Sequence, residues 1–152
     1  MNDQDYLAVI SLVERLHRHF LEVLKLELDG LGIHDINSVQ GMMLFNIGDA
    51  EMTVGQLTLR GCYLGSNVSY NVKKMIENGY LAQERSVHDR RSIHIRLTDK
   101  GRDIRNTVES LYQKHVRTVE QVGGINSEEF ATLNKSLHRL ERFWTDQILY
   151  RL

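Results

Sequence analysis

Hydrogen-bonding and cationic side chains gather between residues 66 and 74, in a stretch with helical periodicity. Val68 and Val72 recur four residues apart, and Met75 and Ile76 follow one turn later, as on the buried side of a helix. The polar residues of this stretch are Ser66, Asn67, Ser69, Tyr70, Asn71, Lys73 and Lys74. Hydroxyl and amide groups early in a helix, followed by lysines, suit the reading of base edges and the binding of phosphates. An ordinary solvated helix face would look similar, so the neighbouring elements decide between the two readings.

A second, shorter helix is predicted just before this stretch. Thr53 is a good N-cap for a helix that ends near Leu59. Residues 62–65 would then turn the chain, and Ser66 or Asn67 would cap the helix that carries the polar face. The order of helix, turn and helix is that of a DNA-reading unit.

Two strands joined by a basic tip are predicted after the second helix. Residues 80–85 and 92–97 read as strands, and the second one alternates apolar and polar side chains. The tip, residues 86–91, ends in Arg90 and Arg91. Adjacent arginines repel each other unless an anion meets them, and arginine suits the negative potential of a narrow minor groove. The whole pattern predicts a winged helix-turn-helix.

Three short motifs follow one another along this region: Gly79-Tyr80-Leu81, then Asp89-x-Arg91, then Ile95-x-Leu97-Thr98-x-x-Gly101. Together they resemble the MarR family of bacterial transcriptional regulators. The resemblance implies that Arg91 reaches the minor groove from the wing and that Asp89 helps to hold the wing. Tyr70 departs from the family pattern, because many members have an arginine at that position of the recognition helix.

The charge distribution agrees with DNA binding by one face of the molecule. The formal net charge is −1. Residues 1–59 carry three basic and nine acidic side chains, whereas residues 60–102 carry nine basic and four acidic ones. Residues 103–152 carry seven of each. A basic module inside an acidic frame is typical of a protein that binds DNA locally, whereas a general polyanion binder would be basic throughout.

Long amphipathic helices are predicted on both sides of the winged unit. Their large apolar residues exceed what one small module can cover, which predicts a homodimer. We therefore expect a single domain, mostly α with a small β-wing. Residues 1–35 and 103–152 would form the dimerisation helices, and residues 36–102 the DNA-binding lobe.

The ends of these helices have recognisable signals. The first helix is expected over residues 5–29, and Asn37 is expected to cap the next one. Thr98 would cap a long helix that stops at Gly123-Gly124, and Asn126 or Ser127 would cap the last one.

An effector site is implied by the family resemblance. In that family, small and often aromatic or phenolic effectors lodge between the dimerisation helices and the DNA-binding lobe. The corresponding residues here are His17, Phe20, Leu21, Leu24, Met42, Met43, Phe45 and Tyr63, with Ile104 or Val108 opposite. Plain core packing is the alternative for each of them. No cofactor is expected to be required.

Other chemistries have weaker support. Cys62 lies near the helix-turn junction, where oxidation would move the reading helix. A lone cysteine with no nearby cation except Arg60 is more often a small buried residue than an oxidant sensor. The seven histidines show no metal-ligand spacing, so no metal site is predicted. There is no phosphate-binding glycine loop, nucleophile elbow or His-Glu-x-x-His motif, so an enzyme is not expected.

The sequence thus predicts a sequence-specific regulator of double-stranded DNA, a repressor of a pseudo-palindromic operator that a small molecule relieves. A single cysteine and the lack of any apolar run near ~18 residues predict a cytoplasmic protein with no membrane span or signal peptide. Two alternatives stay open: a winged-helix protein-interaction module without specific DNA binding, and a metal- or redox-responsive regulator.

Overall fold

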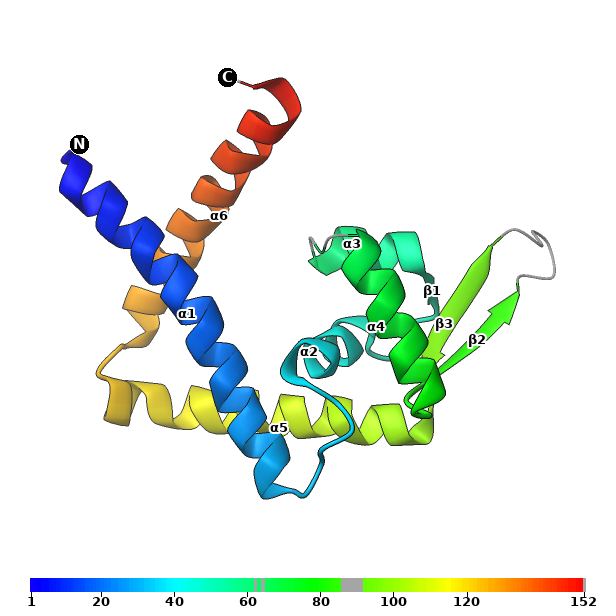
Figure 1. The fold of residues 1–152 in the computed structure, drawn as a ribbon. Helices are drawn as coiled ribbons and strands as arrows, with labels where there is room; N and C mark the ends of the chain where they lie inside the picture. Colours follow the sequence, from blue (N-terminus) through cyan, green and yellow to red (C-terminus); the bar gives the residue numbers. More distant parts are fainter. Residues whose placement is uncertain (62, 64, 86–91, 152) are drawn as a thin grey trace. The chain divides into compact units, whose positions relative to one another are not determined.

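The computed structural model describes residues 1–61, 63, 65–85 and 92–151, in two compact units, residues 1–111 and 112–152 (Figure 1). The elements are α1 (Asp3–Gly30), α2 (Ser38–Ile47), β1 (Met52–Thr53), α3 (Val54–Gly61), α4 (Gly65–Glu77), β2 (Leu81–Arg85), β3 (Ile93–Leu97), α5 (Asp99–Gly123) and α6 (Ser127–Tyr150). The predicted class, mostly α with a small β-wing, is confirmed.

Reciprocal side-chain caps fix the start of three helices. The Asn37 Oδ1 atom accepts a hydrogen bond from the Gln40 backbone N–H at 2.8 Å, and Gln40 Oε1 accepts one from the Asn37 N–H at 3.1 Å. This capping box satisfies two N–H groups that the helix itself leaves unpaired. The same arrangement occurs at α3 between Thr53 and Gln56 and at α6 between Asn126 and Glu129. These predicted caps are therefore confirmed.

Two helix starts differ from the prediction. Helix α1 begins at Asp3, because the Asn2 side chain accepts a hydrogen bond from the Gln4 N–H at 2.9 Å and caps it. Helix α4 begins at Gly65, so Ser66 and Asn67 lie in its first turn, and the prediction that one of them caps it is wrong. Where several polar residues follow one another, residue type alone does not show which of them is the cap and which lie in the first turn of the helix.

The core of residues 1–111 lies where the helices of the winged unit meet α1 and α5. Among its fully buried side chains are Leu24 and Leu28 from α1, Met43, Leu44 and Ile47 from α2, Leu57 from α3, Val68 and Met75 from α4, and Val108 from α5. Burying a side chain of this size contributes about 1.5–3 kcal/mol each, which holds the reading helix firmly on its support.

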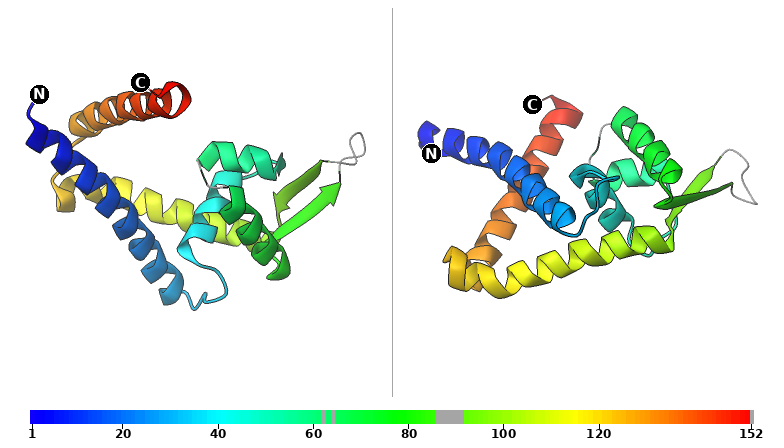
Figure 2. Two further views of the ribbon diagram at one scale, coloured as in Figure 1. Left: turned by 45° about the horizontal axis from the view of Figure 1, so that its top comes forward. Right: turned by 60° about the horizontal axis from the view of Figure 1, so that its bottom comes forward.

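A three-stranded antiparallel sheet with the order β1-β3-β2 forms the base of the wing. Met52 pairs with Ile95, Leu81 with Leu97, and Arg85 with Ile93. Ile95 and Leu97 are buried while Ile93 is exposed, so β3 enters the core as it runs from Ile93 to Leu97. In both views of Figure 2 the β2–β3 ribbon extends beyond the neighbouring helix α4.

The exit from the wing into α5 is tightly packed. Thr98 donates its N–H to the Tyr80 carbonyl oxygen at 3.1 Å, and its Oγ1 accepts from the Gly101 N–H at 3.1 Å, which confirms the predicted cap. Gly101 is buried, and a Cβ added there would lie within 3.0 Å of the Tyr80 carbonyl oxygen. The Leu-Thr-x-x-Gly motif therefore requires glycine for a close backbone approach.

The unit of residues 112–152 has a different character. None of its described residues, 112–151, is fully buried. Large apolar side chains are exposed along α6: Phe130, Leu133, Leu137, Phe143, Ile148 and Leu149. Within the described parts of the chain, no helix is long and apolar enough to cross a membrane.

Candidate nucleic-acid interface

Helix α4 presents a polar face on an apolar support. Val68, Val72 and Met75 are buried on its inner side. The outer side exposes Ser66, Asn67, Ser69, Tyr70, Lys73 and Lys74. Tyr70 is a large side chain with apolar surface, and it is 62% exposed. These side chains can donate and accept hydrogen bonds and neutralise phosphates, as a helix in the major groove requires.

Lys74 is held by its neighbours on α4. Its Nζ lies 6.0 Å from the centre of the Tyr70 ring and 3.6 Å from a carboxylate oxygen of Glu77. Such exposed contacts are weak, so the ammonium group stays available for an anion that approaches the helix.

Asn71 does not lie on the outer face, so its prediction as a base-edge contact is corrected. It is 9% exposed. Its Oδ1 accepts from Gln40 Nε2 at 3.0 Å, and its Nδ2 donates to the Asn67 carbonyl oxygen at 2.8 Å. Both polar atoms of the side chain are occupied inside the lobe, which leaves none to meet a base.

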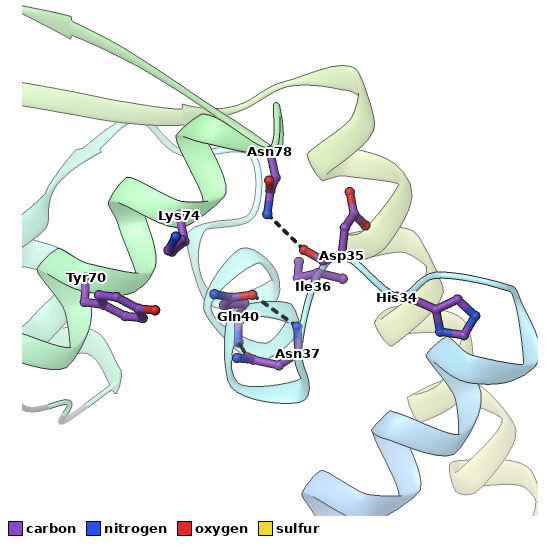
Figure 3. A pocket seen from close by; sticks show the side chains of 8 residues that line it. All are labelled: His34, Asp35, Ile36, Asn37, Gln40, Tyr70, Lys74 and Asn78. Atoms are coloured by element: carbon purple, nitrogen blue, oxygen red, sulfur yellow. Dashed lines mark hydrogen bonds between the residues drawn. The ribbon is translucent and has the colours of Figure 1, made fainter.

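A cavity of 310 Å³ lies beside the outer face of α4. Figure 3 shows Tyr70 and Lys74 of α4 on one side and Asn37 and Gln40, at the start of α2, on the other. The remaining lining residues are His34, Asp35, Ile36 and Asn78. Sequence reasoning missed this part of the site. It located the α2 cap, but no signal in the sequence placed that cap next to the reading helix.

A polar cluster fastens the segment before α2 to the end of α4 and the start of α5. Asp35 accepts a hydrogen bond from the Tyr80 hydroxyl, and its other oxygen lies 3.0 Å from Lys100 Nζ. Asn78 Nδ2 donates to the Asp35 carbonyl oxygen at 3.0 Å (Figure 3). Lys100 Nζ donates to the Asn78 carbonyl oxygen at 2.8 Å. The Lys100 Nζ atom also lies 4.3 Å from the centre of the Tyr80 ring.

This cluster changes the acidity of two of its members. The hydrogen bond from Tyr80, aided by the Lys100 ammonium group, lowers the pKa of Asp35 below its usual value. Burial, with the nearby Asp35 carboxylate, raises the pKa of Tyr80 well above its usual value. The carboxylate therefore stays ionised and the phenol stays protonated throughout the ordinary pH range.

The base of the wing is described, and its tip is not. Arg96 and Glu84 form an ion pair across β2 and β3 at 3.0 Å. The predicted wing residues Asp89, Arg90 and Arg91 lie outside the described residues. Cys62, weighed above for oxidant sensing, also lies outside them.

The residues expected to line an effector site occupy different environments. Leu24 and Met43 are fully buried and His17 is exposed. The other five are partly buried: Phe20, Leu21, Met42, Phe45 and Tyr63. The Tyr63 hydroxyl accepts a hydrogen bond from Asn46 Nδ2 at 2.7 Å, and burial raises its pKa. Ile104 and Val108, the two residues expected on the opposite side of the effector site, are both buried in the core.

Metal binding finds no geometric support in the part of the chain that the structure describes. Among those residues, no group of three or more His, Cys, Asp or Glu side chains is placed to hold a metal ion. His34 lies 3.5 Å from Asp29, and His94 lies 3.9 Å from Glu51, each as an isolated pair.

Comparisons with known proteins agree with this geometry. A model of the MarR family matches residues 34–92. The chain is 36% identical over 145 residues to the exopolysaccharide II synthesis transcriptional activator ExpG of Rhizobium meliloti, covering 95% of this chain and 74% of that protein. A second relative, the HTH-type transcriptional regulator YkoM of Bacillus subtilis, is 31% identical over 75 residues, covering 49% of this chain and 47% of that protein.

Solved structures extend the likeness along the chain. FabT of Streptococcus pneumoniae, in complex with DNA, is 25% identical, with a TM-score of 0.76 and coverage of 93% of this chain and 98% of that one. The transcriptional regulator SlyA has the same fold, with a TM-score of 0.80 at 13% identity over 95% of this chain and 99% of that one. The chain belongs to the MarR family and is a DNA-binding transcriptional regulator.

Proposed function

We propose that the protein binds a pseudo-palindromic operator as a homodimer and that a small-molecule effector controls its occupancy. The observation that carries this proposal is the exposed polar face of α4 on a fully buried apolar support. Residues 36–102 act as the DNA-binding lobe, and residues 1–35 and 103–152 as the dimerisation helices. The setting is the cytoplasm, where the DNA of a bacterium lies.

Each exposed side chain of α4 is given a role by its chemistry. Asn67, Ser69 and Tyr70 meet base edges or nearby phosphates, and Ser66 meets the phosphate at the start of the helix. Lys73 and Lys74 hold backbone phosphates. From the wing, Arg90 and Arg91 enter the minor groove, and Asp89 supports them.

The exposed apolar side chains of α1 and α6 support the proposed dimerisation. Leu12 and Leu16 of α1, and Leu133, Leu137 and Phe143 of α6, are all more than 40% exposed in the single chain. A second copy would cover them. Two reading helices related by a two-fold axis would then meet successive major grooves, roughly 34 Å apart.

The effector is proposed to be a small aromatic or phenolic molecule. The side chains proposed to hold it are those of His17, Phe20, Leu21, Leu24, Met42, Met43, Phe45 and Tyr63. Repression is the expected outcome of operator binding. Activation is the second candidate, because the 36%-identical relative carries the name of a transcriptional activator. A reporter gene is placed under the control of the promoter that carries the operator, and its expression is measured in cells with and without the gene for this protein. The difference shows whether the protein represses or activates transcription.

The first experiment is fluorescence anisotropy of the purified protein on the DNA upstream of its own gene, with a scrambled duplex as the control. The proposal expects tight binding to the upstream fragment alone, with the logarithm of the affinity falling linearly with the logarithm of salt concentration. Equal and weak binding to both duplexes, across the whole salt series, would favour the interaction-module reading instead.

A further inference from the structure

Two buried amides link α2 to the reading helix. Gln40 is 7% exposed and Asn71 is 9% exposed. The Gln40 Nε2 atom donates to Asn71 Oδ1 at 3.0 Å, although the two residues lie 31 positions apart in the chain. Apart from Ser38 and Gly41, the other buried residues of α2 and α4 are aliphatic or methionine.

The amide pair is part of a continuous chain of hydrogen bonds. Gln40 Oε1 accepts from the Asn37 N–H at 3.1 Å, at the cap of α2. At the other end, Asn71 Nδ2 donates to the Asn67 carbonyl oxygen at 2.8 Å, one turn earlier in α4. The backbone at the start of α2 is therefore connected to the backbone of α4 at Asn67, one of the proposed DNA contacts.

This chain of bonds can form in only one rotational setting of α4. Rotating the helix by one residue, about 100°, would move Asn71 out of reach of Gln40. Two buried amides would then lose partners, at a cost of about 1–3 kcal/mol for each unsatisfied group. Aliphatic contacts such as those of Val68 and Val72 are less directional, so they tolerate small rotations better.

We propose that Gln40 and Asn71 are positioning residues that hold α4 in the rotational setting in which its outer side chains meet the correct bases. The inference rests on the proposed function. Phosphate contacts by lysine tolerate small displacements, whereas paired hydrogen bonds to base edges do not. The amide pair therefore controls discrimination between DNA sequences more than total affinity for DNA.

The test replaces both amides with apolar residues of similar shape, Gln40→Met together with Asn71→Leu. Replacing both partners leaves neither side-chain amide unpaired. The Asn37 N–H loses its Gln40 acceptor, but Asn37 is exposed and this N–H can bond to water, so the thermal unfolding midpoint should stay near that of the wild type. Each protein is used to select duplexes from a random DNA pool. Its affinity for the wild-type consensus duplex and for a scrambled duplex is then measured at one salt concentration.

The double variant should lose at least about tenfold in the ratio of these two affinities, the scale of one base contact, with affinity for scrambled DNA unchanged. Met75→Leu is the matched control, since it alters a buried residue of α4 at similar volume and should keep the ratio. If the wild type selects no consensus, the proposed function fails. If the wild type selects one and the double variant discriminates equally well, the positioning role is refuted.

A second variant decides the matter if the double variant proves unstable. In Gln40→Glu, the ionised carboxylate cannot donate to Asn71, whereas the protonated carboxyl can donate to Asn71 and accept from Asn37. Discrimination should therefore recover as pH falls. His34, Asp35 and Lys74 line the adjoining cavity, so the wild type, which keeps all three, is measured over the same pH range as the control. Equal pH profiles for the two proteins would refute the positioning role.

Discussion

Replacing Gly101 with alanine should strain the junction between the wing and α5. The added Cβ would lie within 3.0 Å of the Tyr80 carbonyl oxygen, 3.3 Å from the Tyr80 carbonyl carbon and 3.4 Å from Leu97 Cβ. An ordinary contact begins near 3.4 Å, so the oxygen would have to move by more than about 0.4 Å.

The Tyr80 backbone is poorly placed to move. Its carbonyl accepts the Thr98 N–H at 3.1 Å, and its own N–H donates to the Met75 carbonyl at 2.8 Å. Its side chain is tied to Asp35. Overpacking of a site that cannot relax costs about 1–3 kcal/mol. For a chain of this size that corresponds to a fall of roughly 2–12 °C in the thermal unfolding midpoint.

Thermal and urea unfolding of Gly101→Ala and the wild type measure this cost. Gly55→Ala is the control, because Gly55 is an exposed residue of α3 whose nearest neighbour to an added Cβ is Thr53 Oγ1 at 3.8 Å. Alanine there should leave stability unchanged or raise it by up to about 1 kcal/mol. If Gly101→Ala were as stable as the wild type, close backbone approach would not be the reason for glycine in this motif.

Four further predictions concern DNA binding, acid stability and assembly. Arg91→Ala should weaken operator binding by at least ~1 kcal/mol without dissociating the dimer, and unchanged affinity at fixed salt would refute the wing assignment. Lys73→Ala should weaken binding to operator and scrambled DNA alike and reduce the salt slope by about one, whereas a loss confined to the operator would contradict a phosphate role. Asp35→Asn should be less stable than the wild type at neutral pH, because the wild-type carboxylate has a lowered pKa in the folded state. That advantage is fully present above the usual pKa of an aspartate and is lost as pH falls through the lowered value, so the urea midpoints of the two proteins should converge toward acid pH. Leu137→Glu should give monomers by sedimentation velocity, whereas Lys135→Glu, on the opposite side of α6, should leave the dimer intact.

The local structure was largely predictable from the sequence. Asn37, Thr53, Thr98 and Asn126 were expected as caps and all four have that role. Capping depends on residue type and on spacing within one turn, and both are visible in a linear sequence. Strands β2 and β3 were equally visible, since β3 alternates its side chains with the period of a half-buried strand, whereas the two-residue β1 is only weakly visible in the sequence.

Asn71 shows where the prediction went wrong. It lies three residues after Val68 and four before Met75, which is the spacing of the buried face, yet its amide type placed it among the exposed residues. Its burial depends on a partner, Gln40, from another helix. Pairing between distant segments depends on the tertiary structure, which a linear sequence does not display. The cavity beside α4 was missed for the same reason.

The fixed orientation of α4 constrains how an effector could act on this protein. Asp35 holds the segment before α2 against Asn78 at the end of α4 and against Lys100 at the start of α5. Gln40 and Asn71 hold α2 against the middle of α4. Because these ties join α4 to its neighbours on both sides, a displacement at the end of α1 would move the lobe as one body and would not bend α4 alone. An effector of the kind proposed would then change DNA binding by altering where each reading helix lies in its groove. Mutations that remove these hydrogen bonds should therefore weaken the response to such an effector together with sequence discrimination.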